Sequence, residues 1–236
     1  MKLATAKPCG QNHQVPETLI SHSEYLDLVG MWRTIQGEGP DTGTPCIFVR
    51  FAGCNLQCPM CDTDYTTDRF FLTPLQLVEK IEQIRNRTDN LIVLTGGEPF
   101  RQNLEPLIYL LKKRSFSIQI ETNGTIYPTP NFPFGKVNII CSPKTVLNSA
   151  VIPHISAFKY IIKSGDVAKN GLPIHTINCS STVAHPPQDN EKDVYLQPLD
   201  EGEEISNLKN LDEAVNSCME HGYRLSLQLH KYAGFH

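Results

Sequence analysis

No stretch of this sequence is apolar over the length that a bilayer span needs, and no segment is a block of lysine and arginine. The formal net charge is −4, so the chain is a poor electrostatic match for nucleic-acid phosphates. Residues 1–20 are polar and mixed, and they lack the apolar core of a secretory signal. We therefore expect a cytoplasmic protein that binds neither a membrane nor a nucleic acid.

Charge is sparse as well, at 19% of the residues, but 40% are hydrophobic, as in ordinary globular proteins. A length of 236 residues suits one domain. Residues 1–23 hold few apolar positions in any period, which predicts a weakly ordered N-terminal extension followed by a single domain over 24–236. The segment 165–190 is rich in Gly, Pro, Ser and Asn and reads as a loop around at most one short strand.

Strand patterns alternate with helix-length segments along the rest of the chain, which predicts an α/β fold with a parallel sheet and crossover helices. One helix is marked at its start by Thr73 as a cap and Pro74 in the first turn. The expected helices cover 73–86, 104–114 and 208–221, and the expected strands cover 46–51, 91–95, 116–121, 137–141, 158–162, 194–197 and 224–228.

Polar motifs follow strand after strand. Because the carboxyl ends of parallel strands meet at one rim, these motifs are expected to share one site. They occupy positions 53–54, 95–99, 121–124, 142–144 and 197–200.

Three of the eight cysteines, Cys54, Cys58 and Cys61, crowd into eight residues. Thiolates so close together can converge on a soft metal centre. Three ligands leave one position open, and an open iron of a 4Fe-4S cluster can bind a small chelating molecule such as S-adenosylmethionine. The alternatives are zinc with a distant fourth ligand such as His230, or three inert cysteines in a turn. The other cysteines are scattered and are expected to be buried apolar side chains or free thiols.

The spacing Cys-x3-Cys-x2-Cys is the signature of the radical S-adenosylmethionine enzymes, and the segment 95–99 (Thr-Gly-Gly-Glu-Pro) resembles their Gly-Gly-Glu motif. This resemblance implies a partial barrel of the (β/α)6 type that is open on one side. It also implies a 4Fe-4S cluster on the three cysteines, with S-adenosylmethionine held by its amino group at Gly96, Gly97 and Glu98.

From about Tyr25 to the last residue, the chain further resembles the 7-carboxy-7-deazaguanine synthase family. The matching segments occur in the family's order, and together they are far more specific than the cysteines alone. They are 34–39 (Thr-Ile-Gln-Gly-Glu-Gly), 48–56, 61–64 (Cys-Asp-Thr-Asp), 95–99, 121–125, 142–144 (Ser-Pro-Lys), 197–200 (Gln-Pro-Leu-Asp) and 228–232.

The family resemblance implies the residues of the site. Thr63 would contribute its hydroxyl to a magnesium ion completed by substrate oxygens. The residues expected at S-adenosylmethionine are Met60, Asp62, Gly96, Gly97, Glu98, Ser142, Pro143, Lys144, Gln197, Pro198, Leu199 and Asp200. The residues expected at the substrate are Ile35, Gln36, Gly37, Glu38, Arg50, Thr95, His230 and His236.

Some of these residues carry a signal of their own. Arg50 lies in an otherwise apolar strand and needs a partner, either a substrate carboxylate bound bidentately or an internal salt bridge. The run 36–39 offers backbone groups and a carboxylate that suit the amide edge of a pterin, although it also suits an ordinary glycine turn. His230 alone would be a structural histidine. His236 stands where the family has proline, and its free carboxylate is expected near the substrate.

The implied reaction is that of a carbon–nitrogen lyase. A 5′-deoxyadenosyl radical takes a hydrogen from C6 of 6-carboxy-5,6,7,8-tetrahydropterin. The substrate radical then rearranges with ring contraction, recovers a hydrogen from deoxyadenosine and loses ammonia. This gives 7-carboxy-7-deazaguanine of the queuosine-type pathway and regenerates the cofactor. Expected partners are a reductant such as flavodoxin or ferredoxin and a second copy in a homodimer. The rival hypotheses are an activase that makes a glycyl radical on a partner protein and a non-catalytic metal-binding module.

Overall fold

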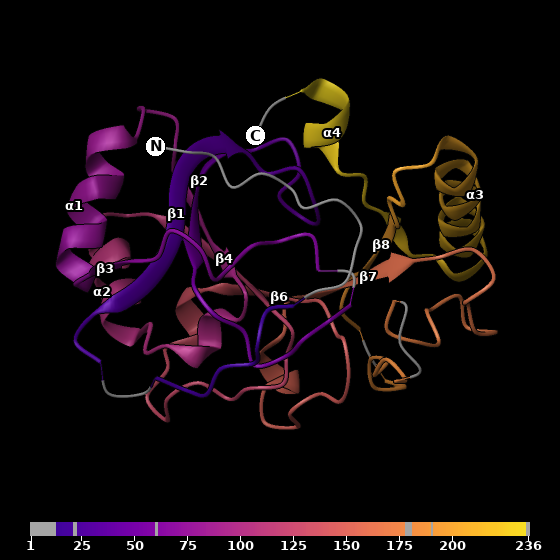
Figure 1. The fold of residues 1–236 in the computed structure, drawn as a ribbon, viewed down its shortest axis with the longest axis horizontal. Helices are drawn as coiled ribbons and strands as arrows, with labels where there is room; N and C mark the ends of the chain where they lie inside the picture. The colour runs from indigo at the N-terminus through magenta and orange to yellow at the C-terminus, as the bar shows by residue number, and fades with distance from the viewer. Residues whose placement is uncertain (1–12, 21–22, 60, 178–180, 190, 235–236) are drawn as a thin grey trace.

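One sheet organises the chain. The structure is a computed structural model that describes residues 13–20, 23–59, 61–177, 181–189 and 191–234. Within these residues, nine strands form a single sheet in the order β3-β1-β2-β4-β5-β6-β7-β8-β9. Every pairing from β2 to β9 is parallel, whereas β1 is antiparallel to both of its neighbours. The parallel strands β2, β4, β5, β6, β7 and β8 form the predicted partial barrel (Figure 1).

The strands are β1 (Leu26–Ile35), β2 (Pro45–Phe51), β3 (Phe70–Leu72), β4 (Leu91–Gly96), β5 (Ser117–Thr122), β6 (Asn138–Cys141), β7 (Ala157–Ile162), β8 (Val194–Pro198) and β9 (Arg224–Leu225). The α-helices are α1 (Pro74–Ile84), α2 (Glu105–Lys113), α3 (Glu204–His221) and α4 (Leu229–Ala233), and short 3-10 turns cover Pro99–Arg101, Phe134–Lys136 and Ile152–His154.

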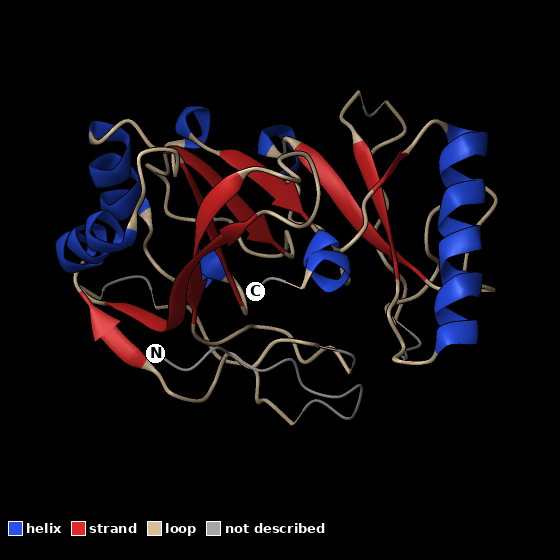
Figure 2. Cartoon of the chain, turned by 90° about the horizontal axis from the view of Figure 1, so that it is seen from above, coloured by secondary structure: helices blue, strands red, loops and turns tan. Residues whose placement is uncertain are grey.

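Helices cover the two ends of the sheet. α1 and α2 lie side by side at one end, and α3 lies at the other (Figures 1 and 2). The helix α1 begins as predicted, because Thr73 and Gln76 form a reciprocal capping box and Pro74 occupies the first turn. The helix α3 begins at Glu204, earlier than the predicted position 208, because the Glu203 carboxylate caps the amides of the first turn.

The three helices expected from the sequence are present as α1, α2 and α3, and the remaining connections contain no α-helix over their described residues. Where the structure describes them, the connections β5–β6 and β6–β7 contain only short 3-10 turns, and the connection β7–β8 is irregular around isolated bridges. Proline and glycine interrupt these segments, so no helical stripe can form there. The predicted last strand is also shortened to Arg224–Leu225, because Gln228 already caps α4.

Strand β1 was not predicted. It carries the motif 36–38 at its carboxyl end, so this motif follows the first strand of the sheet rather than preceding it. Its pairing with β2 shifts register between Leu28 and Gly30, a bulge that interrupts the alternation expected of a strand. The core strands beside it carry continuous apolar runs and were therefore easier to recognise.

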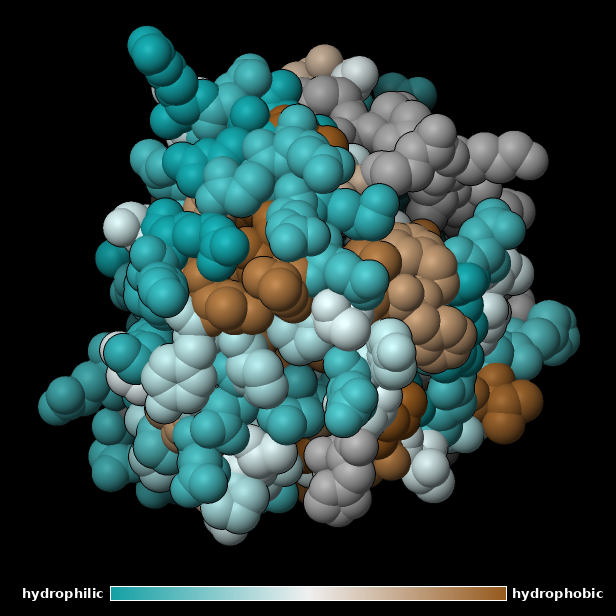
Figure 3. All heavy atoms as spheres, turned by 90° about the vertical axis from the view of Figure 1, so that its left-hand side faces the viewer, coloured by the Kyte–Doolittle hydropathy of each residue, from teal (hydrophilic) through white to brown (hydrophobic). Residues whose placement is uncertain are grey.

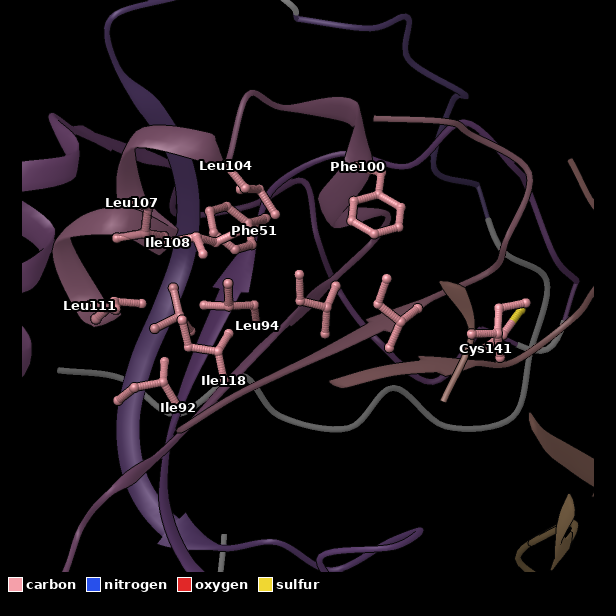
Figure 4. Close-up of a cluster of buried hydrophobic side chains, with 14 of the residues drawn as sticks. Phe51, Ile92, Leu94, Phe100, Leu104, Leu107, Ile108, Leu111, Ile118 and Cys141 are labelled. Carbon is pink, nitrogen blue, oxygen red and sulfur yellow. The ribbon is translucent and has the colours of Figure 1, made fainter. Parts of the chain in front are cut away.

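The two faces of the sheet differ sharply. One face packs its strand residues against α1 and α2 in the main hydrophobic core, which Figure 4 shows around Phe51, Leu94, Leu107 and Leu111. The opposite face, called the inner face below, begins with a small apolar layer at the amino ends of the strands. This layer comprises Cys46, Phe48, Leu91, Val93, Ile140, Ala157 and Tyr195.

Above this apolar layer, the inner face becomes polar toward the carboxyl ends of the strands. Strand alternation places Arg50, Thr95, Glu121, Lys159 and Gln197 on it, one each from β2, β4, β5, β7 and β8. The outer surface near α1 is mostly hydrophilic (Figure 3). Among the described residues, no helix is both long and apolar enough to cross a membrane.

Candidate active site

The cysteine loop begins directly after β2. Gly53 adopts a left-handed conformation (φ 72°), and its amide donates to Tyr65 O at 2.8 Å, which closes the loop at its base. Cys54 is buried, and Cys58 and Cys61 are half-buried. Burial raises the pKa of the Cys54 thiol to about 12, and the two neighbouring thiols add to this effect. Three thiols that oppose each other's ionisation need cationic metal to become thiolates.

This donor set fits an iron–sulfur cluster. Among the residues that the structure describes, no three His, Cys, Asp or Glu side chains converge on a point where a single ion would fit. An iron–sulfur cluster binds its thiolates at different irons, so thiols spread around a loop can hold it. Met60, which was expected at the cofactor, lies outside the described residues.

The glycine motif lies against the cysteine loop. The amide of Glu98 donates to Gly53 O at 3.0 Å. A Cβ on Gly96 would lie 2.3 Å from Phe51 O, and a Cβ on Gly97 would lie 2.1 Å from Gly53 O. Only glycine allows the two backbones to approach this closely. The two motifs found in the sequence are therefore one packed unit at the carboxyl ends of β2 and β4.

The Glu98 carboxylate is fully buried and ties this unit to the next strand. It accepts from Asn123 N at 2.7 Å, Thr122 Oγ1 at 2.8 Å and Phe100 N at 3.0 Å. Burial raises its pKa to about 7, although the three donors oppose the shift. The side chain thus fixes the ends of β4 and β5, and its contact with the amino group of S-adenosylmethionine stays a prediction.

A buried ammonium lies at the centre of the inner face. Lys159 Nζ is 2.5 Å from Glu38 Oε2 and 3.9 Å from Glu121 Oε2. Burial disfavours the charge of Lys159, but the two carboxylates outweigh burial and raise its pKa. Burial likewise opposes ionisation of Glu38, and Lys159 reverses the effect and lowers the Glu38 pKa. Lys159 and Glu38 are therefore both charged in the folded protein at neutral pH.

Amide and hydroxyl groups complete this network. Gln36 Nε2 and Gln119 Nε2 each donate to Glu121 Oε1 at 3.1 Å, and Thr95 Oγ1 donates to Glu121 Oε2 at 3.4 Å. Gln228 Nε2 donates to Glu38 Oε1 at 2.8 Å. The predicted residues Gln36, Glu38 and Thr95 are thereby brought together, although 59 positions separate Gln36 from Thr95 in the chain.

Arg50 retains unused hydrogen-bonding capacity. Its Nε is buried and has no hydrogen-bond partner among the described residues, and its guanidinium carbon lies 5.0 Å from the centre of the Trp32 ring. Two further buried polar atoms on the inner face, Gln119 Oε1 and Gln197 Oε1, have no partner there either. Buried polar atoms without partners are rare in folded proteins, so this face is built to receive a polar ligand.

The C-terminal helix covers the motif that follows β1. Leu229 N donates to Gly37 O at 3.0 Å, and a Cβ on Gly37 would lie 2.6 Å from His230 Nδ1. His230 thus lies against Gly37, next to Glu38, and its contact with the substrate stays a prediction. Ile35 ends β1 with a side chain that is 36% exposed and has no part in the polar network. His236 lies outside the described residues.

The remaining predicted residues fall into two groups. Lys144 Nζ donates to Ser142 Oγ, and Ser142 Oγ donates to Lys159 O, both at 3.0 Å, so the segment 142–144 adjoins the inner face. Burial lowers the pKa of Lys144. In the segment 197–200, Gln197 faces inward, whereas Asp200 forms an ion pair with Lys231 at 2.5 Å. Pro143 is buried, Pro198 pairs with Ile162 at the end of β8, and Leu199 N donates to Ile162 O at 2.8 Å.

Asp62 and Thr63 follow the last cysteine at the mouth of the inner face. Thr63 Oγ1 donates to Asp62 Oδ1 at 3.1 Å, so a hydroxyl and a carboxylate lie together. Both are oxygen groups of the kind that magnesium prefers.

Sequence reasoning missed Lys159 and left Glu121 unassigned. The signal that selected Arg50, a cation within an apolar strand, is also present at Lys159, in the sequence Ala-Phe-Lys-Tyr-Ile-Ile. Gln14 was missed as well, because residues 1–23 were treated as a weakly ordered extension.

The cysteine loop, the glycine motif packed against it and the partial barrel below define a radical S-adenosylmethionine domain. In agreement, residues 48–130 match the sequence model of the Radical SAM superfamily. The enzymes of this superfamily use a 4Fe-4S cluster and S-adenosylmethionine.

Curated relatives identify the family within this class. The chain is 40% identical over 224 residues to the 7-carboxy-7-deazaguanine synthase of Rhodospirillum rubrum, covering 88% of this chain and 92% of that protein. It is 36% identical over 222 residues to the synthase of Rickettsia prowazekii, covering 89% and 88%. The chain belongs to the 7-carboxy-7-deazaguanine synthase family.

A solved structure shares the fold. The crystal structure of QueE from Escherichia coli aligns with a TM-score of 0.66 at 23% identity, covering 88% of this chain and 96% of that one.

Proposed function

We propose that the protein is a carbon–nitrogen lyase that converts 6-carboxy-5,6,7,8-tetrahydropterin into 7-carboxy-7-deazaguanine for 7-deazapurine biosynthesis. The observation that carries this proposal is Arg50, a half-buried cation on the inner face beside the cysteine loop, whose buried Nε has no partner among the described residues. The family relationship supports the same reaction, because the relatives bear the name of the synthase.

The cysteines would hold the 4Fe-4S cluster, which with S-adenosylmethionine supplies a carbon radical able to abstract hydrogen. Gly96 and Gly97 lie against the loop and would hold the cofactor's amino acid portion. Ser142 and Lys144 lie at the other side of the inner face and would meet its adenosine portion. Gln197 Oε1 is buried and has no partner within the described part of the chain, so it can accept a hydrogen bond there.

The substrate would lie on the polar part of the inner face. The guanidinium of Arg50 can bind the pterin carboxylate with two parallel hydrogen bonds, which also satisfies its buried Nε. Glu38 and Glu121 would accept hydrogen bonds from the amide and amino donors of the pterin ring. Because both carboxylates are already held by Lys159 and by glutamine side chains, they can bind without first being ordered.

Magnesium belongs to this proposal as well. Thr63 and Asp62 present oxygen ligands beside the last cysteine, and the substrate carboxylate would complete the ion's coordination. The ion would orient the pterin and offset its negative charge.

The enzyme would need an electron donor such as flavodoxin or ferredoxin, because the cluster must be reduced before it can activate S-adenosylmethionine. We further propose a cytoplasmic homodimer. The exposed apolar side chains Ile205, Leu208 and Met219 on α3 are suited to an interface.

Anaerobic incubation tests this function. The purified protein with reductant, S-adenosylmethionine, magnesium and the carboxypterin should yield a compound with the mass and absorbance of 7-carboxy-7-deazaguanine. Omitting the pterin should leave no such product. Cleavage of S-adenosylmethionine without consumption of the pterin would instead favour a different radical enzyme.

A further inference from the structure

The N-terminal segment 14–20, called the strap below, runs along the cysteine loop. Glu17 N donates to Cys54 O at 2.7 Å, so the strap bonds the backbone of the first cysteine directly. Farther along, Ile20 N donates to Arg101 O at 2.6 Å, and Ile20 forms a parallel bridge with Gln102. A segment that was expected to be weakly ordered is therefore bonded to the loop and to the turn behind it.

Gln14 holds the loop just after its last cysteine. The side chain is only 5% exposed. Its Nε2 donates to Thr63 O at 2.9 Å, and its Oε1 accepts from Tyr65 N at 2.9 Å, so one amide group satisfies two backbone groups of the loop. The Cys61 sulfur lies 3.6 Å from the same Thr63 carbonyl. The Thr63 carbonyl therefore contacts both the Gln14 amide and the Cys61 sulfur and links the two side chains.

Glu17 and Arg101 anchor the two ends of the loop. The Glu17 carboxylate binds Arg101 Nη2 at 3.0 Å and Arg69 Nη1, near the end of the loop, at 2.7 Å. Arg101 is buried beneath the turn that precedes Cys54, where its Nη1 donates to Ala52 O at 3.0 Å. A Cβ on Gly53 would lie 2.2 Å from Arg101 Nη1, so this turn and the guanidinium fit only with glycine.

We propose that the strap belongs to the cluster site, and that Gln14 is a positioning residue that keeps the cysteine loop ready to bind iron. The loop has no helix or strand of its own over its described residues. Such a segment loses conformational entropy when its thiolates are fixed on a cluster, and bonds that order it beforehand lower this cost. The strap supplies those bonds at three places in the cysteine loop. Glu17 N bonds Cys54 at its start, Gln14 bonds the backbone after Cys61, and the Glu17 carboxylate binds Arg69 at its end.

The test measures retention of the cluster rather than catalysis. Full-length protein is reconstituted anaerobically with iron and sulfide, and transfer of iron to the chelator bathophenanthroline is followed. Gln14→Met keeps the length of the side chain but removes its hydrogen bonds to Thr63 O and Tyr65 N. Val15→Ala, at a neighbouring side chain that is 71% exposed, controls for substitution within the strap.

A second control separates this role from general stability. Asn210 is also a buried amide that bridges two backbone groups, since it accepts from Ser164 N at 2.8 Å and donates to Leu199 O at 3.0 Å. It lies on α3, outside the cysteine loop. Asn210→Leu therefore removes a matching pair of hydrogen bonds at a distant position, and thermal unfolding of each apoprotein measures the common loss of stability.

Each buried hydrogen bond contributes a factor of about 5 to an equilibrium, so Gln14→Met should release iron at least about tenfold faster than the wild type. Val15→Ala and Asn210→Leu should stay within about twofold. Equal rates for Gln14→Met and the wild type, or equally fast loss from Asn210→Leu, would overturn the inference. A wild-type chain that takes up no iron would overturn the proposed function as well, whereas a failure to convert pterin would leave this inference standing.

Discussion

Arg50→Lys is the sharpest test of how the inner face recognises its substrate. Lysine keeps the positive charge on β2 but replaces the planar fork of the guanidinium with a single ammonium. The substitution therefore separates bidentate recognition of a carboxylate from a simple attraction between charges.

The structure allows the loss to be estimated. Removing one of two charge-assisted hydrogen bonds costs about 1.5–3 kcal/mol. Loss of the contact between the Arg50 guanidinium and the Trp32 ring, at 5.0 Å, adds about 0.5–1 kcal/mol. Part of this sum is recovered because the ammonium still attracts the carboxylate. We expect a net loss of about 2 kcal/mol in binding free energy, which raises the dissociation constant for the carboxypterin roughly 30-fold.

Binding is measured anaerobically by calorimetry without reductant, so that no turnover occurs. The affinity for the carboxypterin should fall as estimated, while that for S-adenosylmethionine should stay within about twofold. Arg33→Lys on the neighbouring strand β1 is a matched control, because Arg33 forks onto Asp89 outside the inner face. Equal losses for both ligands in Arg50→Lys, or an unfolded protein, would show that Arg50 serves the fold instead.

Three further predictions address the other parts of the site. Replacing Cys54, Cys58 or Cys61 by alanine should abolish cluster assembly, measured by iron analysis, and deoxyadenosine formation, measured by chromatography. Full activity of one variant would show that its cysteine is not a ligand of the cluster. Thr63→Ala should lose most of the acceleration by magnesium while it still binds the cluster and S-adenosylmethionine, and Thr63→Ser should keep it; an unchanged magnesium titration for the alanine variant would place the metal elsewhere. Lys159→Met leaves the half-buried carboxylates of Glu38 and Glu121 without their cation, so burial, no longer offset by Lys159, raises the pKa of Glu38 toward neutrality. Pterin binding by this variant should therefore weaken as the pH falls from about 8 to 6, where wild-type binding stays flat, and parallel pH profiles would contradict the charged network.

Local signals explain what the sequence could predict about the fold. The parallel core strands are continuous apolar runs between turns, and α1 carries its own cap at Thr73, so each could be recognised without its neighbours. Strand β1 was not predicted because its bulge breaks the alternation of apolar and polar residues, and because its partner β2 lies across the antiparallel turn at 36–44. Helices could be predicted only in the connections that carry a helical stripe. The other connections are as long, but proline and glycine interrupt them, and their described residues contain no α-helix.

The site divides in the same way. Cysteine spacing, the glycine motif and Arg50 in its apolar strand are visible within a few residues, and the structure places them together. Contacts between distant segments are not visible in this manner. Lys159 meets Glu38 across 121 positions, and Gln14 meets Tyr65 across 51, so the roles of Lys159 and Gln14 depend on the folded chain.

The central claim is that hydrogen leaves C6 of the carboxypterin as an atom, taken by a carbon radical at this site. The most direct measurement is an anaerobic turnover with the substrate deuterated at C6, followed by mass spectrometry of the deoxyadenosyl group and of the product. The account predicts that deuterium enters the deoxyadenosyl carbon while 7-carboxy-7-deazaguanine forms. Deuterium that appears only in solvent, or that stays at its original carbon, would contradict it.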